Sequence, residues 1–239
     1  MQRWLKEDWI GASARKGQRI LWRAVEAQHV VATMSLVDTL DEQYLLEKLL
    51  EDSKPPMPLG AGHLDYLIFT PFRYTSPYPS RFRKPHEPGI WYGAFERETA
   101  CAEVGYWRWR FLMNSDGLRE GEVKSEHPLF QAKANGRHID LGRPPWDSAS
   151  RLWRDPDDYS HCHALAEQSR ARGIDWIRYR SARHPQGECG GIFNPHALSL
   201  HEPTKRENWI CRVTKRGAIF RHDRLGISID LPGDGAGER

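Results

Sequence analysis

The stretch GIWYGAFERETACAEVGYWRWRFLM, residues 89–113, predicts a strand followed directly by a helix. Its first seven residues are apolar or aromatic apart from two glycines, and this composition predicts a short strand. From about Arg97 to Met113 the apolar residues recur at helical spacing, so a helix is expected directly after that strand. The apolar face of this helix is expected to consist of Ala100, Val104, Trp107 and Phe111.

The residues before this stretch predict one further strand and two helices. LDYLIFTPFRY, residues 64–74, is rich in aromatic and branched side chains and predicts a strand, and a loop with four prolines follows at 75–89. Farther upstream, the apolar spacing predicts a helix from about Arg19 to Thr33. Thr39 and Glu42 have the spacing of a capping box, which marks the start of a second helix.

Proline and glycine indicate a boundary between two parts of the chain. SKPPMPLGAG, Ser53 to Gly62, contains three prolines and two glycines, a composition that neither a helix nor a central strand tolerates. We therefore expect a helical N-terminal extension at residues 1–60, a main domain at 61–231 and a disordered tail at 232–239.

The second half of the main domain predicts one helix and several strands. The helix runs from about Tyr159 to Arg172 and ends at Gly173. The strand-like segments are DWIRYRS (175–181), GGIFNP (190–195), WICRVTK (209–215) and AIFRHD (218–223). Helices and short strands in this order indicate an α/β fold of the α+β type.

The composition of the chain limits the classes of protein to which it can belong. No segment approaches the roughly 18 consecutive apolar residues of a membrane helix, and the opening MQRWLKEDWIG lacks the pattern of a signal peptide. The four cysteines are scattered, which favours reduced thiols. We expect a cytoplasmic protein that does not bind a membrane.

Charge gives little reason to expect direct nucleic-acid binding. The 35 Lys and Arg residues oppose 32 Asp and Glu residues, which leaves a net charge of +3. The basic residues are spread along the whole chain, and no zinc-finger or RNP-type pattern is present.

Glu103 is the first candidate for chemistry. At helical spacing from Ala100 and Trp107 it lies on or beside the expected apolar face, where a carboxylate is unfavourable unless it is paired or used. A structural ion pair with Arg108, Arg110 or a loop arginine is the alternative explanation. The pattern alone leaves both interpretations open.

Arginine and aromatic residues supply candidate ligand groups. Arg73, Arg81 and Arg83 lie on or beside the proline-rich loop, and a guanidinium suits a phosphate or a carboxylate; a solvated basic loop is the alternative. Trp91 and Tyr92 are neighbours on one strand and must face opposite sides. One is expected in the core; the other either lines a cleft, where it could stack on a flat ring, or also packs in the core.

Other motifs are weaker indications of a functional site. Ser181 follows the strand-like WIRYR, but no GxSxG surrounds it, so a nucleophilic triad is not indicated. His161, Cys162 and His163 are adjacent on a helix and point in different directions, which disfavours a metal site. The glycines of GECGG form neither a dinucleotide fingerprint nor a P-loop.

Taken together, three segments resemble the RES domain, the toxin half of bacterial toxin–antitoxin pairs, which is similar to the ADP-ribosyltransferases. They are SRFR (80–83), IWYGAFERETACAEV (90–104) and IRYRSARHPQGECGGIFNP (177–195). Arg81, Tyr92, Glu103 and Ser181 match the family's motif positions in order, although Arg83 competes with Arg81. The first 60 residues have no counterpart in the minimal domain.

The resemblance implies a compact core of two small sheets with flanking helices that binds NAD⁺ as substrate. It implies that Glu103 stabilises the ribosyl cation formed when nicotinamide leaves, and that Arg81, with Arg73 as a helper, binds the pyrophosphate. Tyr92 would stack on nicotinamide or ribose, and Ser181 would contact the substrate and orient Glu103. No metal is required by this chemistry.

Three functions remain open at this stage. The preferred one is transfer of ADP-ribose to a target protein, with the N-terminal extension as a surface for the acceptor. The second is depletion of NAD⁺ by transfer to water or phosphate. The third is a non-enzymatic interaction module in which Glu103 is merely ion-paired. For a toxin, the resemblance also implies a cognate antitoxin, usually a DNA-binding protein, that blocks the cleft.

Overall fold

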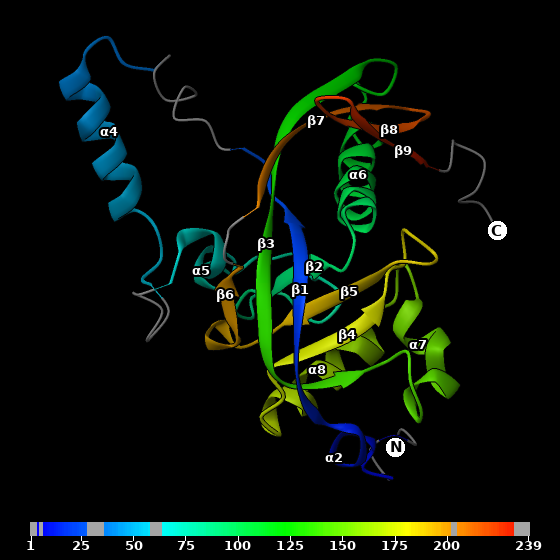
Figure 1. The fold of residues 1–239 in the computed structure, drawn as a ribbon. Helices are drawn as coiled ribbons and strands as arrows, with labels where there is room; N and C mark the ends of the chain where they lie inside the picture. The colour runs from blue at the N-terminus through cyan, green and yellow to red at the C-terminus, as the bar shows by residue number, and fades with distance from the viewer. Residues whose placement is uncertain (1–3, 5–6, 28–35, 58–63, 202–204, 232–239) are drawn as a thin grey trace.

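A computed structural model describes the chain except residues 1–3, 5–6, 28–35, 58–63, 202–204 and 232–239 (Figure 1). The strands in the described residues are β1 (Arg15–Ala24), β2 (Trp91–Ala94), β3 (Glu122–Asp140), β4 (Trp176–Arg180), β5 (Glu188–Ile192), β6 (Leu198–Leu200), β7 (Arg206–Thr214), β8 (Gly217–His222) and β9 (Leu225–Asp230). The helices are α2 (Trp9–Ser13), α4 (Leu40–Asp52), α5 (Tyr66–Arg73), α6 (Arg97–Met113), α7 (Ser150–Arg154) and α8 (Ser160–Ala171). The expected mixed α/β fold is confirmed.

The described strands form one hydrogen-bonded sheet instead of the two small sheets that were expected. Its order is β1-β2-β5-β4-β3-β7-β8-β9, and β1 also pairs with β3. The first five strands of this order therefore close on themselves, while β7, β8 and β9 extend from β3. In Figure 1, β1 and β3 stand side by side, and β2, β5 and β4 cross behind their lower part.

The helix predicted over Arg19 to Thr33 is wrong where the structure describes it. Residues 15–24 form β1, which pairs along its whole length with β3, from Arg15 opposite His138 to Ala24 opposite Leu129. Ladder hydrogen bonds on this strand outweigh the weak helical spacing of its side chains. Residues 28–33 of the predicted helix lie outside the described residues.

The second predicted helix of the N-terminal region is confirmed as α4. Thr39 accepts a hydrogen bond from the Glu42 amide, and the Glu42 side chain accepts one from the Thr39 amide. This is the capping box that the sequence predicts. The boundary near residue 60 stays a prediction, but β1 places part of the first 60 residues inside the main sheet. The tail at 232–239 lies outside the described residues.

The strand predicted over residues 64–74 is wrong, because this segment contains α5. Asp65 caps the helix by accepting a hydrogen bond of 2.8 Å from the Leu67 amide. Pro71 cannot donate to the Leu67 carbonyl, and the Trp91 indole donates to it instead at 3.3 Å. The buried residues, at helical spacing, are Leu67, Ile68 and Phe72.

The longest strand, β3, is missing from the sequence predictions. It contains Pro128 and Gly136, two residues that argue against a central strand, and its exposed and buried side chains alternate. It nevertheless pairs with β1, β4, β6 and β7 along different parts of its length. By contrast, α6, α8, β2, β4, β5, β7 and β8 confirm the predicted elements, and α8 is followed by Gly173 at a φ of 67°.

The core lies on both sides of β2. Trp91 points to one side, against Leu21 and Phe130, and Tyr92 packs against the larger cluster on the other side. This larger cluster contains Trp146 and Trp153, whose rings meet edge to face at 5.7 Å. None of the helices among the described residues is both long and apolar enough to span a membrane.

Candidate active site

A cavity of about 430 Å³ opens between β1, β2, α6 and the loop that precedes β2. The residues that line it lie far apart in the sequence: Trp22, Arg23, Ala24, Pro79, Ser80, Arg81, Tyr92, Gly93, Ala94, Ala100, Glu103, Val104, Trp107, Tyr159, Tyr179, Arg183 and Cys189. Three of the residues predicted from the sequence, Arg81, Tyr92 and Glu103, therefore share one cavity.

Ser181 holds the Glu103 side chain. It follows β4, is fully buried, and donates a hydrogen bond of 2.6 Å from its Oγ to Glu103 Oε1. The same Oγ accepts hydrogen bonds of 3.0 Å from the amides of Arg183 and His184. A hydroxyl has one donor and two acceptor positions, so both acceptor positions are filled and the hydrogen is directed at Glu103. The loop after β4 thus fixes the orientation of this carboxylate.

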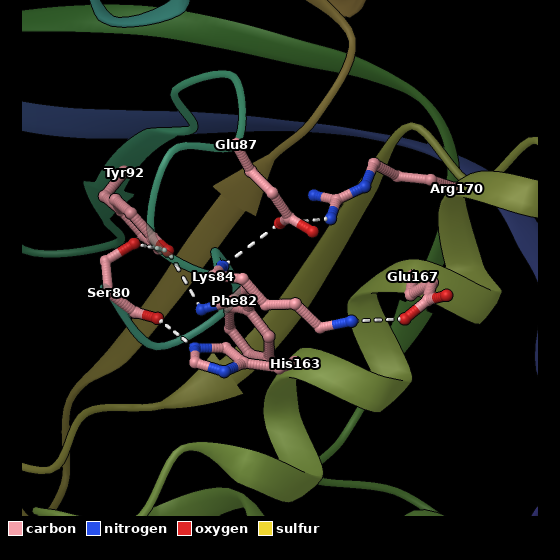
Figure 2. A network of polar contacts seen from close by, with 8 residues as sticks. All are labelled: Ser80, Phe82, Lys84, Glu87, Tyr92, His163, Glu167 and Arg170. Atoms are coloured by element: carbon pink, nitrogen blue, oxygen red, sulfur yellow. Dashed lines mark hydrogen bonds and ion pairs between the residues drawn. The ribbon is translucent and has the colours of Figure 1, made fainter. Parts of the chain in front are cut away.

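Tyr92 has its ring on the cavity side of β2, opposite Trp91, as the alternation of a strand predicts. Its hydroxyl accepts a hydrogen bond of 3.1 Å from the Phe82 amide and lies 2.9 Å from Ser80 Oγ (Figure 2). Burial raises the pKa of Tyr92 to about 12, so the hydroxyl stays protonated at neutral pH. Tyr92 therefore connects β2 to the loop that carries Arg81.

Arg81, and not Arg83, faces the cavity. Its Nη1 donates to the carbonyl oxygens of Trp153 and Asp155, at 2.8 and 3.0 Å, and its guanidinium lies 4.9 Å from the centre of the Tyr159 ring. Arg83 donates to the Tyr78 carbonyl and does not line the cavity. The geometry therefore favours Arg81 at the motif position.

The Arg81 loop is fastened to α8 by a network of polar contacts (Figure 2). His163 Nε2 lies 2.8 Å from the Ser80 carbonyl oxygen and must carry the hydrogen, since a carbonyl only accepts. Lys84 pairs with Glu167 at 2.6 Å, and Arg170 pairs with Glu87 at 2.9 Å. These contacts hold the Arg81 loop on both sides of the arginine.

His163 and Cys162, which are adjacent on α8 and were considered above as metal ligands, make other contacts. His163 is part of the network just described, and Cys162 is fully buried beneath the carbonyls of Leu152 and Trp153. Within the described part of the chain, no group of three His, Cys, Asp or Glu side chains is placed to hold a metal ion.

Arg73 is not brought to the cavity. It ends α5 and pairs with Glu51 of α4 at 2.8 Å, and its Nε donates to the Pro55 carbonyl. It is not among the residues that line the cavity. The structure thus gives no support to the expected role of Arg73 as a helper in phosphate binding, because the contacts of its guanidinium tie α5 to α4.

Sequence reasoning missed several residues of the site. Trp107, expected in the core, is 48% exposed and lines the cavity. Arg183 lies two residues after Ser181, and its guanidinium is 3.5 Å from the centre of the Tyr106 ring. Because Arg183 is so close to Ser181 in the sequence, it could have been predicted as a residue of the site. No feature of the sequence pointed to Arg23, because β1 was not predicted as a strand.

The charges of the cavity favour an anionic ligand. Among the described residues that line it, Arg23, Arg81 and Arg183 are cationic and Glu103 is the single carboxylate. Aromatic side chains stand beside these groups, among them Tyr92 and Trp107. A ligand that combines phosphates with flat rings matches this set of side chains.

Comparisons with known proteins bear on the fold and the family of this chain. A chain in the crystal structure of the M. tuberculosis MbcT–MbcA toxin–antitoxin complex has a similar fold, with a TM-score of 0.50 and 15% sequence identity over 82% of this chain and 88% of the other. A search of curated proteins gave no match. The family model described as RES domain matches residues 58–213. The chain belongs to the RES domain family.

Proposed function

We propose that this protein is the toxin of a bacterial toxin–antitoxin pair and that it cleaves the nicotinamide–ribose bond of NAD⁺. The observation that carries the proposal is the hydrogen bond from Ser181 to Glu103 at 2.6 Å, in a cavity that also presents Arg81 and Tyr92. These four residues come from separate parts of the chain and match the family's motif positions.

The residue types fit the chemistry of this bond. The bond breaks with its electron pair on the ring nitrogen, so nicotinamide leaves as a neutral molecule and the ribose becomes an oxocarbenium ion. A carboxylate that opposes this positive charge and accepts a hydrogen bond from a ribose hydroxyl stabilises the transition state. Glu103 takes this role, and Ser181 keeps its carboxylate in place.

The remaining side chains bind and orient the substrate. Arg81 lines the cavity, where its guanidinium can donate hydrogen bonds to the pyrophosphate, and Tyr92 lines the same cavity with a ring suited to nicotinamide or ribose. The polar network of Figure 2 keeps the Arg81 loop in position before substrate arrives. A preorganised site of this kind loses little free energy in ordering its own groups. The mechanism requires no metal ion.

The acceptor defines two branches of the proposal. Transfer to a protein is the preferred branch, because α4 exposes apolar side chains that suit a protein contact: Leu40, Tyr44, Leu45, Leu49 and Leu50. Transfer to water or phosphate, which depletes NAD⁺, is the alternative. In both branches a cytoplasmic antitoxin, itself DNA-binding, covers the cavity with acidic or polar groups toward Arg81.

Labelled NAD⁺ tests the proposal and separates the branches. The purified chain is incubated with NAD⁺ that carries its label in the adenylate half, with and without cell lysate. We expect release of nicotinamide and label on a protein band. Nicotinamide release with all the label in free ADP-ribose or its phosphate contradicts the transferase branch. Absence of nicotinamide release by folded protein, with and without lysate, contradicts the enzymatic proposal as a whole.

A further inference from the structure

The loop that follows β4 contacts one side of α6 at two points. Thr99 and Glu103 are four residues apart on α6, so their side chains lie on the same side of the helix, one turn from each other. Ser181 donates its hydrogen bond to Glu103, and Thr99 Oγ1 lies 2.8 Å from Nδ1 of His184. The contact between Thr99 and His184 is therefore a second attachment of this loop to the helix that carries Glu103.

The hydrogen atoms of this second contact have a single arrangement. Thr99 Oγ1 also lies 2.9 Å from Glu96 Oε2, and a carboxylate only accepts hydrogen bonds. The one hydrogen of the Thr99 hydroxyl is therefore directed at Glu96, and its oxygen accepts from His184. His184 Nδ1 must carry a hydrogen, so the imidazole is held as a donor toward the helix.

The backbone of His184 connects this contact to Ser181. The His184 amide donates a hydrogen bond of 3.0 Å to Ser181 Oγ, and this is one of the two acceptor contacts that direct the Ser181 hydrogen at Glu103. The Ser181 amide donates to the Gly187 carbonyl, and the Gly187 amide donates to the His184 carbonyl, both at 2.9 Å. Because these bonds close the loop, a movement of His184 away from α6 would withdraw an amide from Ser181.

The loop approaches α6 closely enough for this contact because residue 187 is glycine. A Cβ at residue 187 would overlap the Thr99 side chain and lie 2.7 Å from His184 Nδ1, which is too close for any side chain. Thr99 itself is completely buried. Its contact with His184 is therefore shielded from water, where a hydrogen bond is electrostatically stronger.

We propose that His184 is a positioning residue, which fixes the orientation of the Glu103 carboxylate from a place outside the cavity. This inference rests on the proposed function, in which Glu103 opposes the charge of the ribosyl cation. Neither Thr99 nor His184 is among the residues that line the cavity. Their effect on the reaction passes through Ser181, so it changes the rate of the chemical step and leaves substrate binding unaltered.

A purely structural role for the contact between Thr99 and His184 predicts a different result. If the contact only stabilises the fold, its loss lowers the Tm and reduces activity by the same factor with or without the Ser181 hydroxyl. If it acts through Ser181, its loss has no further effect on kcat once that hydroxyl has been removed. Effects that pass through a shared residue do not add, so a double-mutant cycle separates the two roles.

The test measures nicotinamide release from NAD⁺ by the full chain. Thr99→Val keeps the branched shape of the side chain and removes its hydroxyl. We expect kcat to fall about fivefold with an unchanged KM, and to fall no further when Thr99→Val is added to Ser181→Ala. Thr99→Ser keeps the hydroxyl and should restore kcat. Thr70→Val is the matched control and should change neither constant, because the Thr70 hydroxyl bonds only to the Tyr66 carbonyl of its own helix.

Each outcome supports or overturns the inference. If Thr99→Val leaves kcat unchanged, or lowers it by the same factor with and without the Ser181 hydroxyl, the role of His184 is overturned, while nicotinamide release by the wild type leaves the proposed function intact. If the folded wild type releases no nicotinamide, the proposed function and this inference fail together.

A second pair of variants replaces Thr99→Val if that variant does not fold. His184→Leu removes the donor, whereas His184→Asn keeps a side-chain N–H group close to the position of Nδ1. A kcat that falls for the leucine variant and recovers for the asparagine variant supports the inference, and equal kcat values for the two contradict it.

Discussion

The two faces of α6 have different tasks, although both are built from apolar and small residues. One face packs against the sheet, where Gly105 lies beneath Ala218 and Phe220 of β8. The other face lines the cavity with Glu103, Val104 and Trp107, beside the buried Ala100. In Figure 1 this helix stands beside β8 and β9, with β1 and β2 toward its lower end.

The difference shows how close packing and open surface are distributed on a single helix. A glycine at the packed face lets two backbones approach, and any added side chain meets atoms already in place. A charged group on that face would lose its water without gaining a partner. On the cavity face, Glu103 is half-buried and held by Ser181. We therefore expect substitutions on the packed face to change stability, and those on the cavity face to change activity.

Glu103→Gln should produce the largest effect. The substitution keeps the size of the side chain and removes the charge that, in the proposed mechanism, opposes the ribosyl cation. We expect NAD⁺ cleavage to fall by about 10²- to 10³-fold with a Tm close to that of the wild type. Nicotinamide release and thermal melting measure the two quantities, and Glu98→Gln, an exposed position on the same helix, is the control.

The same substitution separates the enzyme from an interaction module. If the protein acts as a toxin by cleaving NAD⁺, bacterial growth inhibition should disappear together with NAD⁺ loss. Growth inhibition that persists in a folded Glu103→Gln protein supports a module that acts without catalysis, in which Glu103 only pairs with a neighbour.

Gly105→Val should produce the next largest effect, on stability. A Cβ added at residue 105 would lie 3.0 Å from Ala218 Cβ and 3.2 Å from the Phe220 ring, and valine adds two further methyl groups. We expect a loss of about 2 kcal/mol in the free energy of unfolding, which lowers the Tm by about 4–8 °C. Gly117→Val is the control, because apart from its two chain neighbours no described residue has a heavy atom within 4 Å of its added Cβ. A large loss of activity per folded molecule would contradict the division between the two faces.

The sequence predicted α6 but could not tell its two faces apart. The helical spacing over residues 97–113 is regular, so the helix and its length were predicted correctly. The expected core face was wrong in part: Trp107 and Phe111 are 48% and 52% exposed. Aromatic residues among arginines satisfy the apolar pattern on either face, because their rings can also line a cavity.

Contacts between distant parts of the chain were harder to predict. Ser181 and Glu103 are 78 residues apart, and no local pattern joins them. Only the resemblance to the RES domain indicated that they meet. The role of β1 was missed for a similar reason, since a strand that pairs with two distant partners is specified by those partners as much as by its own side chains.

Ser181→Ala should lower both the activity and the stability of the protein, each by an intermediate amount. Glu103 loses its hydrogen-bond donor, and the amides of Arg183 and His184 lose their acceptor. We expect activity to fall about tenfold and the free energy of unfolding to fall by about 1 kcal/mol. Ser169→Ala is a matched control, because Ser169 is equally buried and its Oγ has no partner among the described residues. Equal effects of the two substitutions would show that the contact with Glu103 has no special role.

Trp107→Ala should have the smallest effect, and it tests where the boundary between the two faces of α6 lies. The side chain is nearly half exposed on the cavity face, so its removal leaves the packing against β8 intact. If its ring stacks on a flat part of the substrate, the KM for NAD⁺ rises about fivefold while kcat and Tm stay unchanged. Phe111→Ala is the control, because Phe111 is similarly exposed on the same helix but does not line the cavity. A fall in Tm with an unchanged KM would place Trp107 with the packed face, and the boundary between the two faces of α6 would then lie between Glu103 and Trp107.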